Sequence, residues 1–194
     1  MKELRYSLRI GFIGEKGLIR DIFLENLSKS TVEFDLSREN YIFEIVFKQI
    51  PLKIKTYLAE NLENLLYKVN KIKKLDILII TINLHKPESL NTINRKRMQE
   101  FNSQFNFNGL TALVGLDLEQ IFNKSPSGKF KISRFQLEKI TKDLNLIYCY
   151  EIFNKDNDID EIYDKLLNDF LIRFQYSNRE LFEKVKDYGK KLIS

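Results

Sequence analysis

The chain has 194 residues, of which 43% are hydrophobic and 30% charged, with a net charge of +5. This composition is that of a globular protein long enough to bury a core, and with one Cys and one His it excludes an internal disulfide and a Cys/His zinc site. There is no run of about 18 apolar residues, so no membrane span is expected, and no signal peptide is expected. The basic residues are dispersed and indicate solvated helix faces; a footprint for a phosphate backbone is the alternative.

Strand and helix signals alternate along the chain. Alternating or continuous apolar runs predict strands, and apolar residues at helical spacing predict helices. Strands are expected at Leu8–Ile13, Tyr41–Gln49, Leu52–Thr56, Leu75–Asn83, Leu110–Gly115 and Leu146–Tyr150. Helices are expected at Gly17–Ser30, Leu58–Lys73, Pro87–Phe105, Ser133–Asn145, Ile159–Tyr176 and Asn178–Leu192, and a polar loop at Ser125–Gly128.

The first strand and helix have the layout of a phosphate-binding loop without its residues. That loop reads G-x-x-x-x-G-K-[ST], in which backbone N–H groups and the Lys hold phosphates and the hydroxyl holds Mg²⁺. Gly14 and Gly17 are present, but Ile19 replaces the second Gly, Arg20 the Lys and Asp21 the hydroxyl. The branched side chain would crowd a phosphate, so we expect a degenerate loop that binds neither nucleotide nor metal.

The order of the elements resembles that of a Ras-type small GTPase, whose other motifs are also missing. The D-x-x-G motif needs a glycine, and none occurs between Gly17 and Gly109. The guanine-reading N-K-x-D motif corresponds to Leu116–Glu119 and lacks the Asn and Lys, and S-A-K is absent near residues 152–154. The resemblance implies a small-GTPase-like fold, and the missing motifs imply that it has neither catalysis nor a cofactor. A divergent Ras-like GTPase with an altered loop is the alternative.

The expected fold class is therefore α/β: a small-GTPase-like (P-loop-type) sandwich with a mostly parallel central sheet and helices on both faces. Residues 1–176 would form this domain, and residues 177–194 an extra C-terminal helix packed on it or extending from it. In such sheets ligands bind beyond the carboxyl ends of the strands. The functional loops are expected after Ile13, Thr56, Asn83, Gly115 and Tyr150.

A more specific resemblance lies in the segment Asp76–His85, followed by Ser89 and Leu90. The centromere protein M family has an apolar strand that ends in Asn-Leu-His, with Ser-Leu a few residues later. Four further segments agree in order and spacing: Ile10–Gly14, Asn108–Leu110, Gly115 and Leu146–Cys149. The similarity covers about Ile10 to Glu151, whereas the stretches 52–74 and 119–131 are longer than in the family.

This resemblance implies a pseudo-GTPase that serves as a structural subunit of the inner kinetochore in the nucleus. Its partners would be subunits resembling centromere proteins I, H and K, with DNA contact absent or indirect and no membrane. A pseudo-GTPase adaptor in another pathway, such as membrane traffic, is the alternative.

Apolar residues stand where a nucleotide site would be polar, and they are the candidate partner-binding residues. Leu116, Leu118, Ile152 and Phe153 are such residues, and Phe107 is a further partner-binding candidate. An exposed apolar patch is typical of a protein interface, and packing against the chain's own loops is the alternative. His85 and Cys149 are interpreted as structural, and the pair Asp117 and Glu119 as a solvated loop, rather than as catalytic groups.

Overall fold

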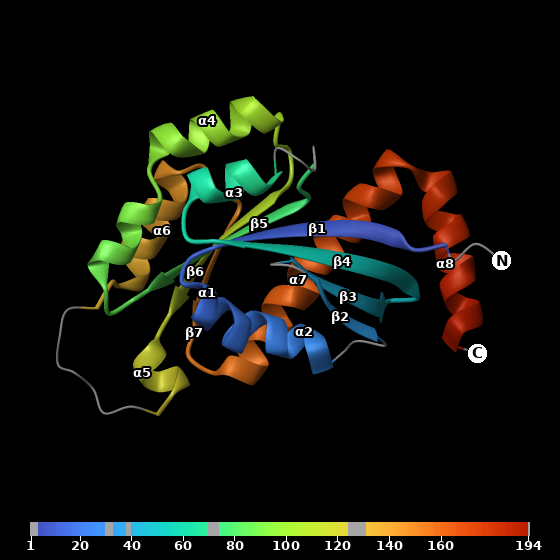
Figure 1. The fold of residues 1–194 in the computed structure, drawn as a ribbon, viewed down its shortest axis with the longest axis horizontal. Coiled ribbons are helices and arrows are strands. Elements are labelled where there is room, and N and C mark those ends of the chain that lie inside the picture. Colours follow the sequence, from blue (N-terminus) through green and yellow to red (C-terminus); the bar gives the residue numbers. More distant parts are fainter. Residues whose placement is uncertain (1–3, 30–32, 38–39, 70–73, 124–130, 194) are drawn as a thin grey trace.

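One mixed β-sheet lies between two layers of helices (Figure 1). The computed structural model describes residues 4–29, 33–37, 40–69, 74–123 and 131–193. The strands are β1 (Tyr6–Ile13), β2 (Glu33–Ser37), β3 (Asn40–Phe47), β4 (Ile50–Ala59), β5 (Ile77–Asn83), β6 (Leu110–Leu116) and β7 (Tyr148–Ile152). Their order across the sheet is β2-β3-β4-β1-β5-β6-β7.

The sheet is mostly parallel, as the sequence predicts. The strands β4, β1, β5, β6 and β7 run in the same direction, whereas β2 and β3 are antiparallel to their neighbours. The strand order reverses at β1, which has β4 on one side and β5 on the other. At such a switch point the flanking loops diverge, so ligands of α/β sheets bind beyond the carboxyl ends of these strands.

The helices follow the predicted order. A continuous helical segment after β1 consists of α1 (Lys16–Ile19), a π-helical turn η1 (Arg20–Leu24) and α2 (Glu25–Lys29). The remaining helices are α3 (Leu62–Val69), the 3₁₀-helix η2 (Pro87–Thr92), α4 (Arg95–Phe105), α5 (Leu118–Ile121), α6 (Arg134–Asp143), α7 (Lys155–Ser177) and α8 (Arg179–Ile193).

Each face of the sheet has its own hydrophobic core. Residues from α1, η1, α2 and α7 pack on one face, and residues from α3, α4 and α6 pack on the other. Burial on both faces of the sheet explains why the sequence of β5 is a continuous apolar run. Ile77 and Ile79 point into the first core, and Leu78, Ile80 and Ile82 into the second, because alternate side chains of a strand face opposite sides of the sheet.

The C-terminal helix α8 packs on the sheet rather than extending from it. Phe182 and Val185 are buried in the first core, and the ring of Phe182 lies 5.4 Å from that of Phe174 in α7. Gly189 lies against the β3–β4 turn, where a Cβ atom would come within 1.9 Å of the carbonyl oxygen of Gln49. Only a residue without a side chain fits this contact.

Three predicted segments need correction. The helix expected at 58–73 begins only at Leu62, because Leu58 and Ala59 continue β4. Most of the described part of the stretch 52–74, which is longer than in the family it resembles, is β4 and α3. The helix expected at Pro87–Phe105 is divided into η2 and α4, and β2 was not predicted at all. In the stretch 119–131, α5 covers the start, while Ser125–Gly128 lies outside the described residues.

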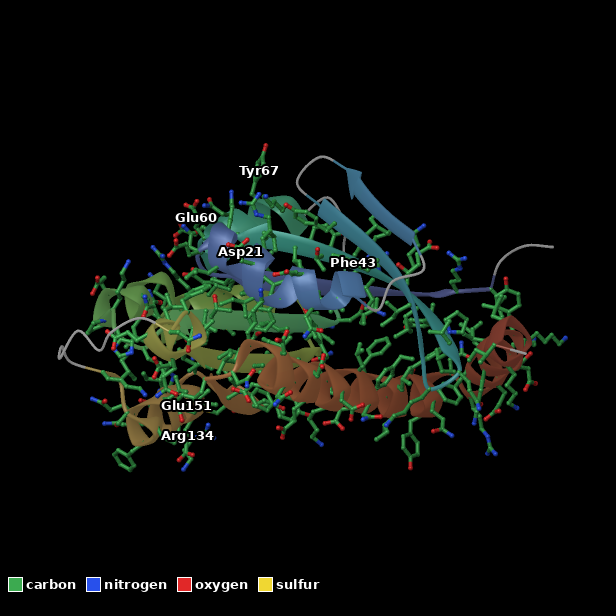
Figure 2. The ribbon with its side chains drawn as sticks, turned by 90° about the horizontal axis from the view of Figure 1, so that it is seen from below. Asp21, Phe43, Glu60, Tyr67, Arg134 and Glu151 are labelled. Atoms are coloured by element: carbon green, nitrogen blue, oxygen red, sulfur yellow. The ribbon has the colours of Figure 1, made fainter. Side chains whose placement is uncertain are left out.

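The free edge of β7 is covered by a side chain of α6. The guanidinium of Arg134 donates to the carbonyl oxygen of Cys149 at 3.2 Å and lies 3.9 Å from the carboxylate of Glu151 (Figure 2). A charged side chain over an edge strand hinders pairing with another chain. Among the described helices, none is long and apolar enough to cross a membrane.

Candidate functional site

The loop between β1 and α1 contains only Gly14 and Glu15. Gly14 has a φ of +143° and donates its N–H to the carbonyl oxygen of Ala59 at 2.9 Å. The Thr81 hydroxyl, which donates to the carbonyl oxygen of Ile13 at 3.0 Å, would lie 2.0 Å from a Cβ atom at Gly14. The loop is therefore held tightly between β4 and β5, and with two residues it is too short to curve around a phosphate.

The helix begins where the phosphate-binding loop would continue. Ile19 is fully buried, and its N–H donates to the carbonyl oxygen of Glu15 at 3.0 Å. Arg20 and Asp21 are exposed, and Figure 2 shows Asp21 on the outer side of the helix. The N–H groups of Ile19 and Arg20 are therefore paired inside the helix and are not available to hold a phosphate.

A hollow of about 300 Å³ lies at the switch point, between this loop and the exit of β5. Its charged lining residues are two lysines, Lys16 and Lys86, and two glutamates, Glu15 and Glu60, so their charges cancel. The polar groups after β5 bind within their own loop, since the Asn83 side chain accepts from the N–H of His85 at 2.9 Å. Balanced charge and satisfied polar groups do not favour a polyanion.

A buried carboxylate, Asp117, joins three loops at the exits of β5 and β6. Its side chain is 2% exposed and accepts from Lys131 Nζ at 2.7 Å. It also lies 3.1 Å from Nε2 of His85 and accepts from the N–H of Gln120 at 3.1 Å, which caps α5. The Nδ1 atom of His85 lies 3.6 Å from the Glu119 carboxylate. The sequence-based reading of Asp117 as part of a solvated loop is therefore wrong.

The electrostatics of this cluster stabilise the charged carboxylate. Burial raises the pKa of Asp117, but the hydrogen bonds from Lys131, Gln120 and His85 outweigh it and hold that pKa below its usual value. Oδ1 accepts from the N–H of Gln120 and faces Nε2 of His85, and Oδ2 accepts from Lys131. The cluster fits a structural cross-link better than a base or a ligand reader, because its acceptor atoms are already used.

The structure separates the five candidate partner-binding residues. Leu116 and Ile152 are almost fully buried in β6 and β7, so they belong to the core, and Leu118 is half-buried against it. Phe153 is 39% exposed, with Lys131 Nζ 5.0 Å above its ring. Phe107 lies near the start of β6, at the amino ends of the parallel strands, whereas Phe153 lies at their carboxyl ends. The ring of Phe107 packs on that of Phe101 with centroids 5.3 Å apart.

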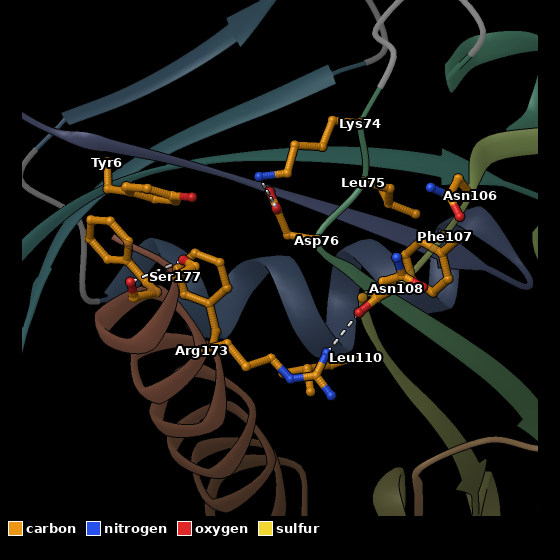
Figure 3. Close-up of a pocket in the computed structure, with 13 residues that line it drawn as sticks. Tyr6, Lys74, Leu75, Asp76, Asn106, Phe107, Asn108, Leu110, Arg173 and Ser177 are labelled. Carbon is orange, nitrogen blue, oxygen red and sulfur yellow. Dashed lines mark hydrogen bonds and ion pairs between the residues drawn. The ribbon is translucent and has the colours of Figure 1, made fainter. Parts of the chain in front are cut away.

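A second hollow, of about 390 Å³, lies at the amino ends of β1, β5 and β6 (Figure 3). Its walls come from the start of β1, the residues before β5, the α4–β6 loop and the last turns of α7. No local sequence pattern reveals this hollow, because its residues come from four segments that are distant in the sequence. Among its lining residues, Phe107 is one of the candidate partner-binding residues.

The charged groups on two sides of this hollow form ion pairs or hydrogen bonds with neighbouring protein atoms. Lys74 Nζ lies 3.1 Å from the Asp76 carboxylate, which also accepts from the N–H of Arg9 at 2.9 Å. Burial lowers the pKa of Lys74, but the Asp76 carboxylate outweighs it and raises that pKa. Arg173 donates from Nη1 to the carbonyl oxygen of Asn108 at 2.8 Å.

Comparison with known proteins does not assign the chain to a family. A scan against protein-family models finds no match, and a search of curated proteins finds none. Among the described residues, no group of three or more His, Cys, Asp or Glu side chains is placed to hold a metal ion.

Proposed function

We propose that this protein is a non-catalytic pseudo-GTPase that binds partner proteins rather than nucleotide. The mixed sheet with helices on both faces is compatible with a small-GTPase-like sandwich. The observation that carries the proposal is the two-residue loop Gly14–Glu15, after which the chain is helical through the whole window of the phosphate-binding motif. The mutual pairing of Asp117, Lys131 and His85 supports it, because polar groups at the same edge are already used.

The resemblance to the centromere protein M family suggests the setting of this function. In this proposal the protein is a structural subunit of the inner kinetochore in the nucleus. Its partners are subunits that resemble centromere proteins I, H and K, and any contact with DNA is indirect. The exposed apolar ring of Phe153, beside the cation of Lys131, is the described candidate residue best placed to meet a partner.

Nucleotide binding is tested by thermal unfolding with and without Mg·GTP or Mg·GDP, using an ordinary small GTPase as positive control. A ligand at a hundred times its Kd would stabilise the fold by about 2.7 kcal/mol, which for a domain of this size raises Tm by roughly 5–10 °C. We expect a change within about 1 °C. A nucleotide-dependent rise of several degrees would instead support the divergent-GTPase alternative.

Partner binding is tested by a tagged pull-down from cells of the source organism, read by mass spectrometry. Recovery of inner-kinetochore subunits that depends on Phe153 would support the proposed setting. Recovery of membrane-traffic factors would keep the pseudo-GTPase proposal but move it to another pathway. Recovery of a nucleotide exchange factor would argue against both.

A further inference from the structure

The hollow at the amino ends of the strands has an aromatic wall held in a fixed position. Phe170 and Phe174 of α7 are 6% and 3% exposed, and the half-buried ring of Tyr6 packs on them with centroids 5.4 and 3.9 Å away. Phe107 lines the opposite side (Figure 3). The volume of about 390 Å³ is in the range of small-molecule sites, which are largely apolar with a few placed polar groups.

Two cationic side chains line this hollow, one on each of two sides. Figure 3 shows Lys74 on one side and Arg173 on the other, with Asp76 beside Lys74. Asp76 is the carboxylate among the lining residues, and its oxygens already bind Lys74 and the N–H of Arg9. Two cations and one carboxylate leave a net charge of +1 on the lining.

The second positive charge of the lining is on Arg173, and the Asp169 carboxylate, one turn away on α7 and outside the lining, interacts with it electrostatically. A guanidinium has five N–H donors, and within the described part of the chain Arg173 uses Nη1 alone, for the carbonyl oxygen of Asn108. Because that bond orients the planar group, the other donors are available to a carboxylate in a forked geometry.

We propose that this hollow, lined by Tyr6, Phe107, Phe170, Phe174, Lys74 and Arg173, binds a planar aromatic group that carries one carboxylate. The rings of the wall would pack against the aromatic group, and Arg173 would hold the carboxylate. One residual positive charge fits a single carboxylate better than a polyphosphate. The ligand could be a free aromatic acid or an aromatic side chain beside an acidic residue in a partner protein.

The site is independent of the proposed function. It lies at the opposite edge of the sheet from Gly14 and Asp117, so its failure would leave the pseudo-GTPase proposal standing, and the reverse also holds.

The first test is a titration of ¹⁵N-labelled full-length protein with indole-3-acetate, followed by amide NMR. We expect shifts confined to Tyr6 and to residues 74–76, 106–110 and 170–177. Indole-3-acetamide, which has the same ring and no charge, should bind about tenfold more weakly or worse, because it lacks the charge-assisted hydrogen bond. Equal binding of the two, or shifts centred elsewhere, would overturn the proposal.

Variants assign the binding to the two walls. Arg173→Gln should weaken binding of indole-3-acetate about tenfold, whereas Arg179→Gln, an exposed arginine of α8 outside the hollow, should leave it unchanged. Asn108→Trp, at an exposed rim position, should block binding by filling the hollow. This second variant keeps the test decisive if Arg173→Gln disturbs the loop. Wild-type affinity in a folded Arg173→Gln or Asn108→Trp protein would contradict the assignment.

The source of the ligand is distinguished by a capped tetrapeptide, acetyl-Gly-Trp-Asp-Gly-amide. If it causes the same shifts and loses affinity in Arg173→Gln, a partner's chain can supply the group. If only indole-3-acetate does so, the site takes a free acid. If neither binds at millimolar concentration, the proposal is wrong.

Discussion

Lys131 Nζ lies 2.7 Å from Oδ2 of Asp117, and this ion pair connects the exit of β6 with the segment that leads into α6. The second carboxylate oxygen faces His85 Nε2 at 3.1 Å, so the exit of β5 is joined as well. The carboxyl edge of the sheet, where α/β proteins commonly bind ligands, is here held together by the protein's own charges.

Asp117→Asn should destabilise the fold by about 1–3 kcal/mol at pH 7, because it replaces a charged acceptor of Lys131 in a buried position. The pKa of Asp117 is lowered in the folded protein. Its contribution is therefore present above the unfolded-state pKa of about 4 and is lost as the pH falls through the lower folded value. Urea unfolding between pH 7 and 3 should show the wild-type advantage shrinking toward acid.

The matched control is Asp143→Asn, at an exposed position at the end of α6. It should change the free energy of unfolding by less than about 0.5 kcal/mol. If Asp117→Asn behaves like this control, the ion pair contributes no net stability.

Gly14→Ala should destabilise the fold by about 2 kcal/mol or more, because an alanine at φ +143° is strained and its Cβ would collide with Thr81 Oγ1. Gly17→Ala is the internal comparison. A Cβ atom there meets nothing within 4 Å, so the change should stabilise the helix by up to about 1 kcal/mol. Denaturant unfolding of both variants checks the opposite signs, and a neutral Gly14→Ala would refute the tight loop.

Gly189→Ala should release α8 from the sheet, since the added Cβ would lie 1.9 Å from the Gln49 carbonyl oxygen. Hydrogen exchange should show faster exchange over residues 179–193, with β1 and β5 still protected. Glu183→Ala, on an exposed position of the same helix, should leave exchange unchanged. Protection of α8 in the glycine variant would show that the helix can shift to absorb the methyl group.

Phe153→Ser should reduce recovery of the partner in a pull-down while leaving Tm within about 2 °C of wild type, because the ring is 39% exposed. Tyr176→Ser removes an aromatic ring of α7 that is 87% exposed, and it is the control for nonspecific binding through exposed aromatic rings. Equal loss with both variants, or with neither, would exclude Phe153 from the interface.

Local sequence signals placed most elements and failed where distant pairing decided the conformation. Leu58 has the spacing of a helix residue with Leu62 and Leu65, yet it lies in β4 because β1 offers a partner, with Leu58 opposite Phe12. The strand β2 pairs with β3 and was missed although Glu33–Ser37 alternates polar and apolar residues, which is the pattern of a strand with one buried face. Propensity is a weak guide where a neighbouring strand supplies the hydrogen bonds.

The sequence by itself determined the α/β class, the burial of β5 on both faces and the loss of the phosphate-binding residues, because these depend on local composition and periodicity. Only the tertiary structure decided that Leu116 and Ile152 are core, that Phe107 lies at the opposite edge from Phe153, and that Tyr6 and Arg173 share a hollow. Strand order sets which distant segments meet, and that order results from long-range pairing that no local pattern encodes.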